Sequence, residues 1–233
     1  MKGLLCVAAL AAVVLCFESS GFGQKPAPSD PLANTQTPRL STLRPQVSGP
    51  FGLVRGMTKE QILDKVGKSS LGSVENDKAG GVSMFLTTVP KPYKSFVMYQ
   101  VYVSPTEGLL KIVAFTDFID TAADGTQLRD AFSSLKDQLQ IPYGDPTSQY
   151  DYVKGDSIWR ESQDFMMGMV KHDRTLSCYW IASDKTPLKD SITAISLKAA
   201  AKDSSTGLVM LIYEFAGWSG YAETLDSKEG SVL

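Results

Sequence analysis

The chain has 233 residues, of which 43% are hydrophobic and 21% are charged, and its formal net charge is −2. This composition is ordinary for a globular protein, and the length allows one substantial core or two small ones. The mildly acidic balance argues against a nucleic-acid-binding protein, because phosphate binding needs clustered Lys and Arg side chains.

Residues 1–23 have the layout of a secretory signal peptide: a basic start, an apolar run from Gly3 to Phe17 and a region of small residues. The run is about 15 residues long, shorter than the roughly 20 that cross a bilayer as a helix. We therefore expect export to the periplasm or the exterior, with no transmembrane anchor after signal removal. A lipid anchor at Cys16 is the disfavoured alternative, because the preceding Leu15 is bulkier than the small residue of lipoprotein signals.

Residues 24–50 contain six of the twelve prolines, interleaved with Ser, Thr, Gln and Asn. Proline removes backbone donors and the polar residues offer little to bury, so we expect a disordered linker. An α+β domain is predicted over residues 51–215, followed by a C-terminal tail over residues 216–233 whose hydrophobic periodicity is lost.

The domain opens with the best local signal in the chain, a short helix between Gly56 and Gly67. Thr58 and Gln61 have the spacing of a capping box, and Gly67 suits the left-handed position that ends a helix. Three runs rich in β-branched and aromatic residues follow and predict strands. These runs are residues 82–88, 96–103 and 109–116, with a hairpin turn over residues 104–108.

A second helix is predicted from an apolar stripe at helical spacing, and it is followed by further strands. The stripe consists of Leu128, Ala131, Phe132, Leu135 and Leu139, and the strands are expected near residues 157–160, 165–171, 175–182, 192–198 and 208–215. Cys178 lies in an alternating run that favours a buried strand position. The order predicts two tandem units, residues 51–118 and 119–215, each a helix followed by antiparallel strands, with the helices packed on one face of the sheet.

The segment Phe51–Gly67 resembles the opening of small bacterial envelope domains of the SmpA/OmlA type, which begin with a Gly-Met-Thr-Xaa-(Glu/Gln) helix start and a glycine stop. The doubled helix-and-sheet plan is similar to the beta-lactamase-inhibitor-protein-like arrangement. Tyr143–Pro146, Ile158–Trp159 and Ile212–Phe215 are similar to segments of a group of exported bacterial proteins. By analogy, the resemblance implies an envelope location and a binding or assembly role.

The residues that carry familiar chemistry are scarce, and we predict neither a cofactor nor a metal. One histidine and one cysteine outside the signal cannot supply the usual zinc ligands, and no phosphate-binding glycine loop is present. His172 with Asp173 and Ser177 is a weak catalytic candidate, because adjacent residues on a strand or turn point apart. A cluster of three carboxylate residues near Trp159 is a second candidate, since paired carboxylates beside aromatics are typical of glycosidases. The cluster consists of Asp156, Glu161 and Asp164.

Aromatic residues on the strand-like runs and in the tail are the candidate partner-binding residues, because Tyr and Trp favour interfaces. They are Tyr99, Tyr102, Trp159, Trp218 and Tyr221. For the strand aromatics we favour a place in the core or simple filling of the surface. For the tail aromatics we favour a fold-back that covers a sheet edge, and partner contact is the alternative in both cases.

The leading hypothesis is an exported, non-enzymatic protein that binds a protein or envelope component through an open sheet face. Its alternatives are a carboxylate-dependent hydrolase that acts on an envelope polymer, and a structural protein without a specific partner.

Overall fold

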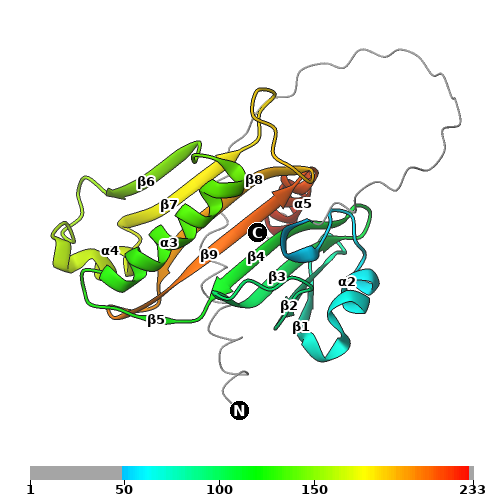
Figure 1. Ribbon diagram of the computed structural model, residues 1–233, viewed down its shortest axis with the longest axis horizontal. Coiled ribbons are helices and arrows are strands. Elements are labelled where there is room, and N and C mark those ends of the chain that lie inside the picture. The colour runs from blue at the N-terminus through cyan, green and yellow to red at the C-terminus, as the bar shows by residue number, and fades with distance from the viewer. Residues whose placement is uncertain (1–48, 231–233) are drawn as a thin grey trace, which may run out of the picture. The chain divides into compact units, whose positions relative to one another are not determined.

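The computed structural model describes residues 49–230, with the side chains of residues 49–227. The predicted signal peptide and all but the last two residues of the predicted linker lie outside this range. The described chain forms a nine-stranded antiparallel sheet in the order β1-β2-β3-β4-β9-β8-β7-β6, with the short β5 paired to β9 (Figure 1). An α+β fold is therefore confirmed. Within residues 49–230, no helix is long and apolar enough to cross a membrane.

The strands are β1 (Leu71–Asn76), β2 (Val82–Leu86), β3 (Phe96–Ser104), β4 (Gly108–Thr116), β5 (Ile119–Asp120), β6 (Ser148–Val153), β7 (Arg174–Ile181), β8 (Ile192–Ala201) and β9 (Thr206–Phe215). The α-helices are α2 (Lys59–Val66), α3 (Thr126–Tyr143), α4 (Phe165–Val170) and α5 (Trp218–Gly230). The 3-10 turns are η1 (Pro50–Gly52), η2 (Lys68–Ser70) and η3 (Ser162–Asp164).

The most locally encoded elements form as predicted. Thr58 and Gln61 make both bonds of the capping box at the start of α2, and Gly67 follows its last turn. The 104–108 turn joins β3 and β4 as a hairpin, with Ser104 opposite Gly108. The strands predicted over residues 175–182, 192–198 and 208–215 correspond to β7, β8 and β9.

Two predicted strands are wrong, and three strands of the structure were not predicted. Residues 157–160 form a loop, and Phe165–Val170 is the helix α4, whose buried side chains face β7 and β8. Methionine-rich sequence has good helix propensity, so the apolar run was compatible with either structure. The strands that were not predicted are β6, an exposed and polar segment without an apolar run, the mostly exposed β1 and the two-residue β5.

The face of the sheet that α3 covers is called the first face here, and the opposite one the second face. The first face carries the larger core. Leu128, Phe132, Leu135 and Leu139 of α3 are all buried in this core, which confirms the predicted stripe. Figure 1 shows α3 along β8 and β9, the two strands that it contacts most. Phe51 caps the same core, because its ring makes edge contacts with those of Phe96, Tyr99 and Tyr213.

The second face is also lined by buried side chains, including Phe85, Val113, Phe115 and Met210. Helix α5 packs there, since the Trp218 ring lies 5.4 Å from the Tyr102 ring and Lys111 Nζ lies 4.3 Å from the Trp218 ring centroid. Helices therefore lie on both faces of the sheet, and not on one face as predicted. The segment expected to be a tail without periodicity contains this helix.

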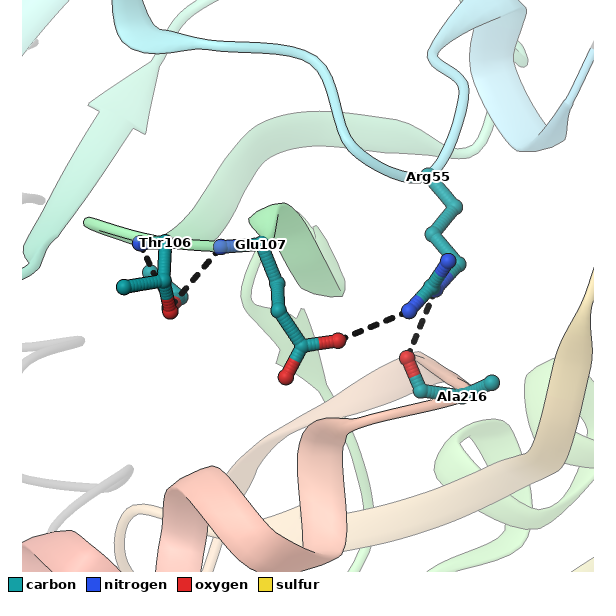
Figure 2. A network of polar contacts seen from close by, with 5 residues as sticks. Arg55, Thr106, Glu107 and Ala216 are labelled. Carbon is teal, nitrogen blue, oxygen red and sulfur yellow. Dashed lines mark hydrogen bonds and ion pairs between the residues drawn. The ribbon is translucent and has the colours of Figure 1, made fainter.

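A polar network at the β3–β4 turn holds the opening segment to the end of β9 (Figure 2). The Arg55 guanidinium donates to the Ala216 carbonyl at 2.7 Å and to Glu107 Oε2 at 2.8 Å. Gly108 of this turn lies against the backbone of Gly56 in the opening segment. Only glycine fits there, because its φ is +70° and an added Cβ would lie 2.3 Å from the carbonyl oxygen of Gly56.

Candidate functional site

Strand β6 ends the sheet and presents the most exposed aromatic side chains among those that the structure describes. Tyr150 is 40% exposed and Tyr152 is 50% exposed. Both rings belong to one row of aromatic side chains. The Tyr150 ring makes edge contacts with the Tyr152 ring, at a centroid distance of 6.4 Å, and with the Tyr179 ring of β7, at 5.8 Å. Exposed aromatics with one apolar face and one polar tip are typical of contact surfaces.

The backbone of β6 has one paired side and one outward side. The Lys154 N–H donates at 2.8 Å to the carbonyl of Asp173, the residue directly before β7, and Ser148–Val153 continues in register with β7. Because hydrogen-bonding direction alternates along an antiparallel strand, the even-numbered residues bond to β7. Gln149, Asp151 and Val153 therefore turn their N–H and C=O groups outward, and no other strand within residues 49–230 pairs with them.

The first-face side of β6 is polar and charged. A groove of about 350 Å³ runs between α3 and β6. Arg129 contacts Asp151 across it at 3.6 Å, and Lys136 Nζ donates to Gln149 Oε1 at 3.4 Å. The two sides of the edge thus differ, with tyrosines on one and a balanced set of charges on the other.

Strand β7, the neighbour of β6 in the sheet, holds the edge in position. Trp180 of β7 is buried and its indole N–H donates to the Gly144 carbonyl at 2.8 Å, which fixes the connection from α3 to β6. Cys178 lies opposite Gln149 and is buried, as predicted. Burial raises the pKa of the Cys178 thiol to about 12, so at neutral pH it is a packing residue and not a nucleophile.

The structure does not bring the five predicted partner-binding residues together as an exposed surface. Tyr99 lies in the first-face core at 1% exposure, and Trp159 is half-buried in the loop before η3. Tyr102 and Trp218 pack on each other on the second face, and the Tyr221 hydroxyl donates to Asp77 Oδ2. These contacts place four of the five in the packing of the domain, and they leave partner binding by this set a prediction.

Ser177 is not linked by a hydrogen bond to the other catalytic candidates, His172 and Asp173. His172 is exposed in the turn before β7, whereas Ser177 is buried on the second face, where its hydroxyl has no hydrogen-bond partner. Asp173 instead accepts from the Ser157 hydroxyl at 2.9 Å and contacts Lys154 at 3.7 Å. A nucleophile–base–acid series needs each pair within hydrogen-bond reach, and this arrangement does not provide it.

The carboxylates near Trp159 have an exposed setting. Asp156 and Glu161 are exposed on the loop between β6 and α4, and Asp164 is half-buried in η3. Among the described residues, no group of three or more His, Cys, Asp or Glu side chains could hold a metal ion.

The β6 edge could have been noticed from the sequence only through the spacing of Tyr150 and Tyr152. Residues two apart share one face of a strand, so Ser-Gln-Tyr-Asp-Tyr-Val carries a two-residue aromatic period. A single repeat of this pattern is not enough to distinguish a strand from a loop. Only the pairing with β7 shows that both rings lie on one surface.

No family model, curated protein or solved structure matches this chain. The resemblance of Phe51–Gly67 to SmpA/OmlA-type domains therefore remains a prediction that rests on the capping-box segment alone.

Proposed function

We propose that this chain is an exported, non-enzymatic binding protein whose contact surface is the β6 edge, defined as Ser148–Val153 with its outward backbone and the rings of Tyr150 and Tyr152. The proposal keeps the predicted role in binding a protein or envelope component, and it moves the contact from the centre of the sheet to its edge. The observation that carries it is the exposed tyrosine pair on an edge strand.

Two physical arguments support this surface. Natural sheets often protect an edge strand with a bulge, because the unpaired N–H and C=O groups of a regular edge can pair with another chain. Strand β6 has six consecutive register pairs with β7 and no bulge. Tyrosine also loses little conformational entropy on binding, because it has only two side-chain torsions, so an exposed pair favours partner contact.

Export and the tandem-unit organisation are further parts of the proposal. Export is supported by the signal-like layout of residues 1–23. Tandem units are supported by the strand order, in which β1–β4 and β6–β9 run inward from the two edges and meet at the β4–β9 pair. The SmpA/OmlA-like opening would agree with an envelope assembly role.

The carboxylate hydrolase gains no support from the described residues. Glycosidase chemistry requires two carboxyl groups that flank a bound substrate, whereas Asp156 and Glu161 are exposed on a loop. We therefore propose the binding role alone.

A capture experiment with matched variants tests the proposed function. The full chain, its Tyr150→Ala/Tyr152→Ala double variant and an Ile158→Ala control are each immobilised and exposed to envelope extract from the source cell. Ile158 is 80% exposed and lies outside β6, so its truncation removes exposed apolar surface without touching the edge. We expect a reproducible partner with the wild type and the control, reduced at least about tenfold with the double variant, since central aromatic contacts each contribute about 2 kcal/mol or more. Equal capture by all three would contradict the proposal.

A further inference from the structure

We propose that the β6 edge takes β6 of a second copy of this chain, in an antiparallel pair about a two-fold axis that passes beside Tyr150. The two nine-stranded sheets would then form one continuous sheet. This inference rests on the proposed function in using the same edge, and it names the occupant.

The backbone restricts the register of such a pair. Facing residues of two antiparallel strands point to the same side of the sheet, so a two-fold axis perpendicular to the sheet must pass beside a single residue. Two registers keep the most of Ser148–Val153 paired, one centred on Tyr150 and one centred on Asp151. Both use the outward N–H and C=O groups of Gln149 and Asp151.

Charge complementarity selects the Tyr150-centred register. In the other register, Asp151 would face the partner's Asp151, and like charges directly opposite each other are destabilising. In the Tyr150-centred register, Asp151 faces the partner's Gln149. Because Lys136 Nζ lies 3.4 Å from Gln149 Oε1, the partner's Lys136 would lie beside Asp151. The two-fold axis produces this opposite-charge contact twice.

The tyrosine side of the strand is compatible with the same register. Tyr150 bonds through its backbone to β7, so Tyr150 and the partner's Tyr150 form a non-hydrogen-bonded pair, in which side chains approach most closely. Tyr152 faces the partner's Ser148, a small residue that leaves space for its ring. Aromatic cross-strand pairs are favourable in this position.

Closure distinguishes this pair from the other contact that the sheet allows. Joining β6 to β1 of another copy would be head-to-tail and would propagate as a filament, whereas the β6–β6 pair is self-complementary and stops at two chains. Strand β1 is also irregular, with a register shift between Leu71 and Ser73. An edge of six residues gives an interface at the small end of the protein–protein range, so we expect a concentration-dependent dimer and not a permanent one.

Sedimentation velocity of the full chain over a wide concentration range tests the dimer. Asp151→Pro removes an outward N–H while sparing the bonds from β6 to β7, as proline is tolerated where the N–H faces solvent on an edge strand. Asn76→Pro is the matched control, because the Asp77 N–H bonds inward to Gly81 and Asn76 therefore faces outward on β1. We expect the wild type and Asn76→Pro to dimerise, and Asp151→Pro to dissociate at least about tenfold more readily with an unchanged melting temperature.

A cysteine scan tests the register separately. A non-hydrogen-bonded pair has Cα atoms about 4.5 Å apart, within the range of a disulfide. Under oxidation by oxygen with a copper catalyst, Tyr150→Cys should form a 150–150 link between chains, identified by peptide mass spectrometry, and Tyr152→Cys should not link to itself. Absence of a 150–150 link in Tyr150→Cys, under conditions in which the wild type dimerises, would overturn the register.

The outcomes separate this inference from the proposed function. A wild type that stays monomeric at every concentration, or an Asp151→Pro variant that dimerises normally, would overturn the dimer. If that monomer still captured a partner and lost it on removal of Tyr150 and Tyr152, the β6 edge would be a binding site for a different protein. Dimerisation without any captured partner would limit the role of the edge to self-association.

Discussion

The two edges of the sheet are built differently, and the difference is the basis for proposing β6 and not β1 as the contact edge. Strand β1 has a register shift between Leu71 and Ser73, and its largest exposed apolar side chain is Val74 at 36%. Strand β6 is in continuous register and exposes two tyrosines. A bulge twists an edge and disrupts its ladder, which discourages pairing. Strand β1 therefore has a feature that discourages pairing, and strand β6 lacks it.

The turn after β1 adds to this protection. Asp77 Oδ1 accepts from the N–H groups of Ala79 and Gly81, both at 2.9 Å, while its Oδ2 accepts from the Tyr221 hydroxyl of α5. One carboxylate thus closes the β1–β2 turn and fastens the C-terminal helix to it. At the β6 edge the corresponding polar contacts, Arg129–Asp151 and Lys136–Gln149, lie on the surface. An exposed ion pair such as Arg129–Asp151 contributes little to stability.

The largest expected effect comes from removing the support beneath β6. Trp180→Ala should lower the free energy of unfolding by about 3–5 kcal/mol, because it empties a buried site and leaves the Gly144 carbonyl without its donor. Urea denaturation would measure the loss, and hydrogen exchange should speed up first in β6. Met84→Ala, buried on β2 beside β1, is the control and should speed up exchange in β1 instead. Equal acceleration at both edges would contradict independent support.

Next in size is the link that locks the β1 side. Tyr221→Phe removes the hydrogen bond to Asp77 and should cost about 1.5–3 kcal/mol, the usual range for a bond to a charged group. Thermal denaturation would report the change, with increased exchange in the β1–β2 turn. Tyr150→Phe, which removes a hydroxyl from an exposed ring, should change stability by less than about 0.5 kcal/mol. A larger loss from Tyr150→Phe than from Tyr221→Phe would reverse the assignment of the two edges.

A smaller effect is expected at the helix that leads into β1. Thr58→Ala removes the side-chain acceptor of the α2 capping box and should cost about 1 kcal/mol. Thr58→Ser keeps the acceptor and should be close to neutral. Chemical denaturation of both variants decides the point, and a neutral Thr58→Ala would show that α2 is held by packing alone.

The smallest effect at neutral pH concerns Cys178, which lies opposite Gln149 of β6. Burial raises the pKa of its thiol to about 12 from an ordinary value of 9.0. The folded state therefore holds a proton that the unfolded state releases, so this group's contribution to stability is complete below pH 9 and declines as the pH rises from 9 to 12. The stability difference between wild type and Cys178→Ala should stay constant up to pH 8.5 and shrink above pH 9. A constant difference up to pH 10.5 would show that the thiol is not shielded beneath the edge.

Much of the local structure could be predicted from the sequence, because short-range patterns decide it. The capping box of Thr58 and Gln61 formed, the α3 stripe is buried, and Cys178 lies on a core strand. Where local preference and tertiary context differ, the prediction failed. Phe165–Val170 is an apolar run compatible with strand or helix, and it became α4 under the packing of β7 and β8.

The candidate site could not be predicted in the same way. The aromatic residues Tyr102 and Trp218 are distant in sequence, and their mutual packing hides both from solvent. Tyr150 and Tyr152 looked unremarkable because exposure depends on which strand lies at the edge. That position follows from the β4–β9 pairing, which places β6 last.

By itself, the sequence determined the α+β class, the helix α3, the β3–β4 hairpin and the buried state of Cys178, since hydrophobic periodicity and capping act over a few residues. Only the tertiary structure decided the order of the strands, the packing of α5 on the second face and the identity of the exposed edge. These features depend on contacts between residues far apart in the chain, whose strength is set by packing and register and not by local propensity.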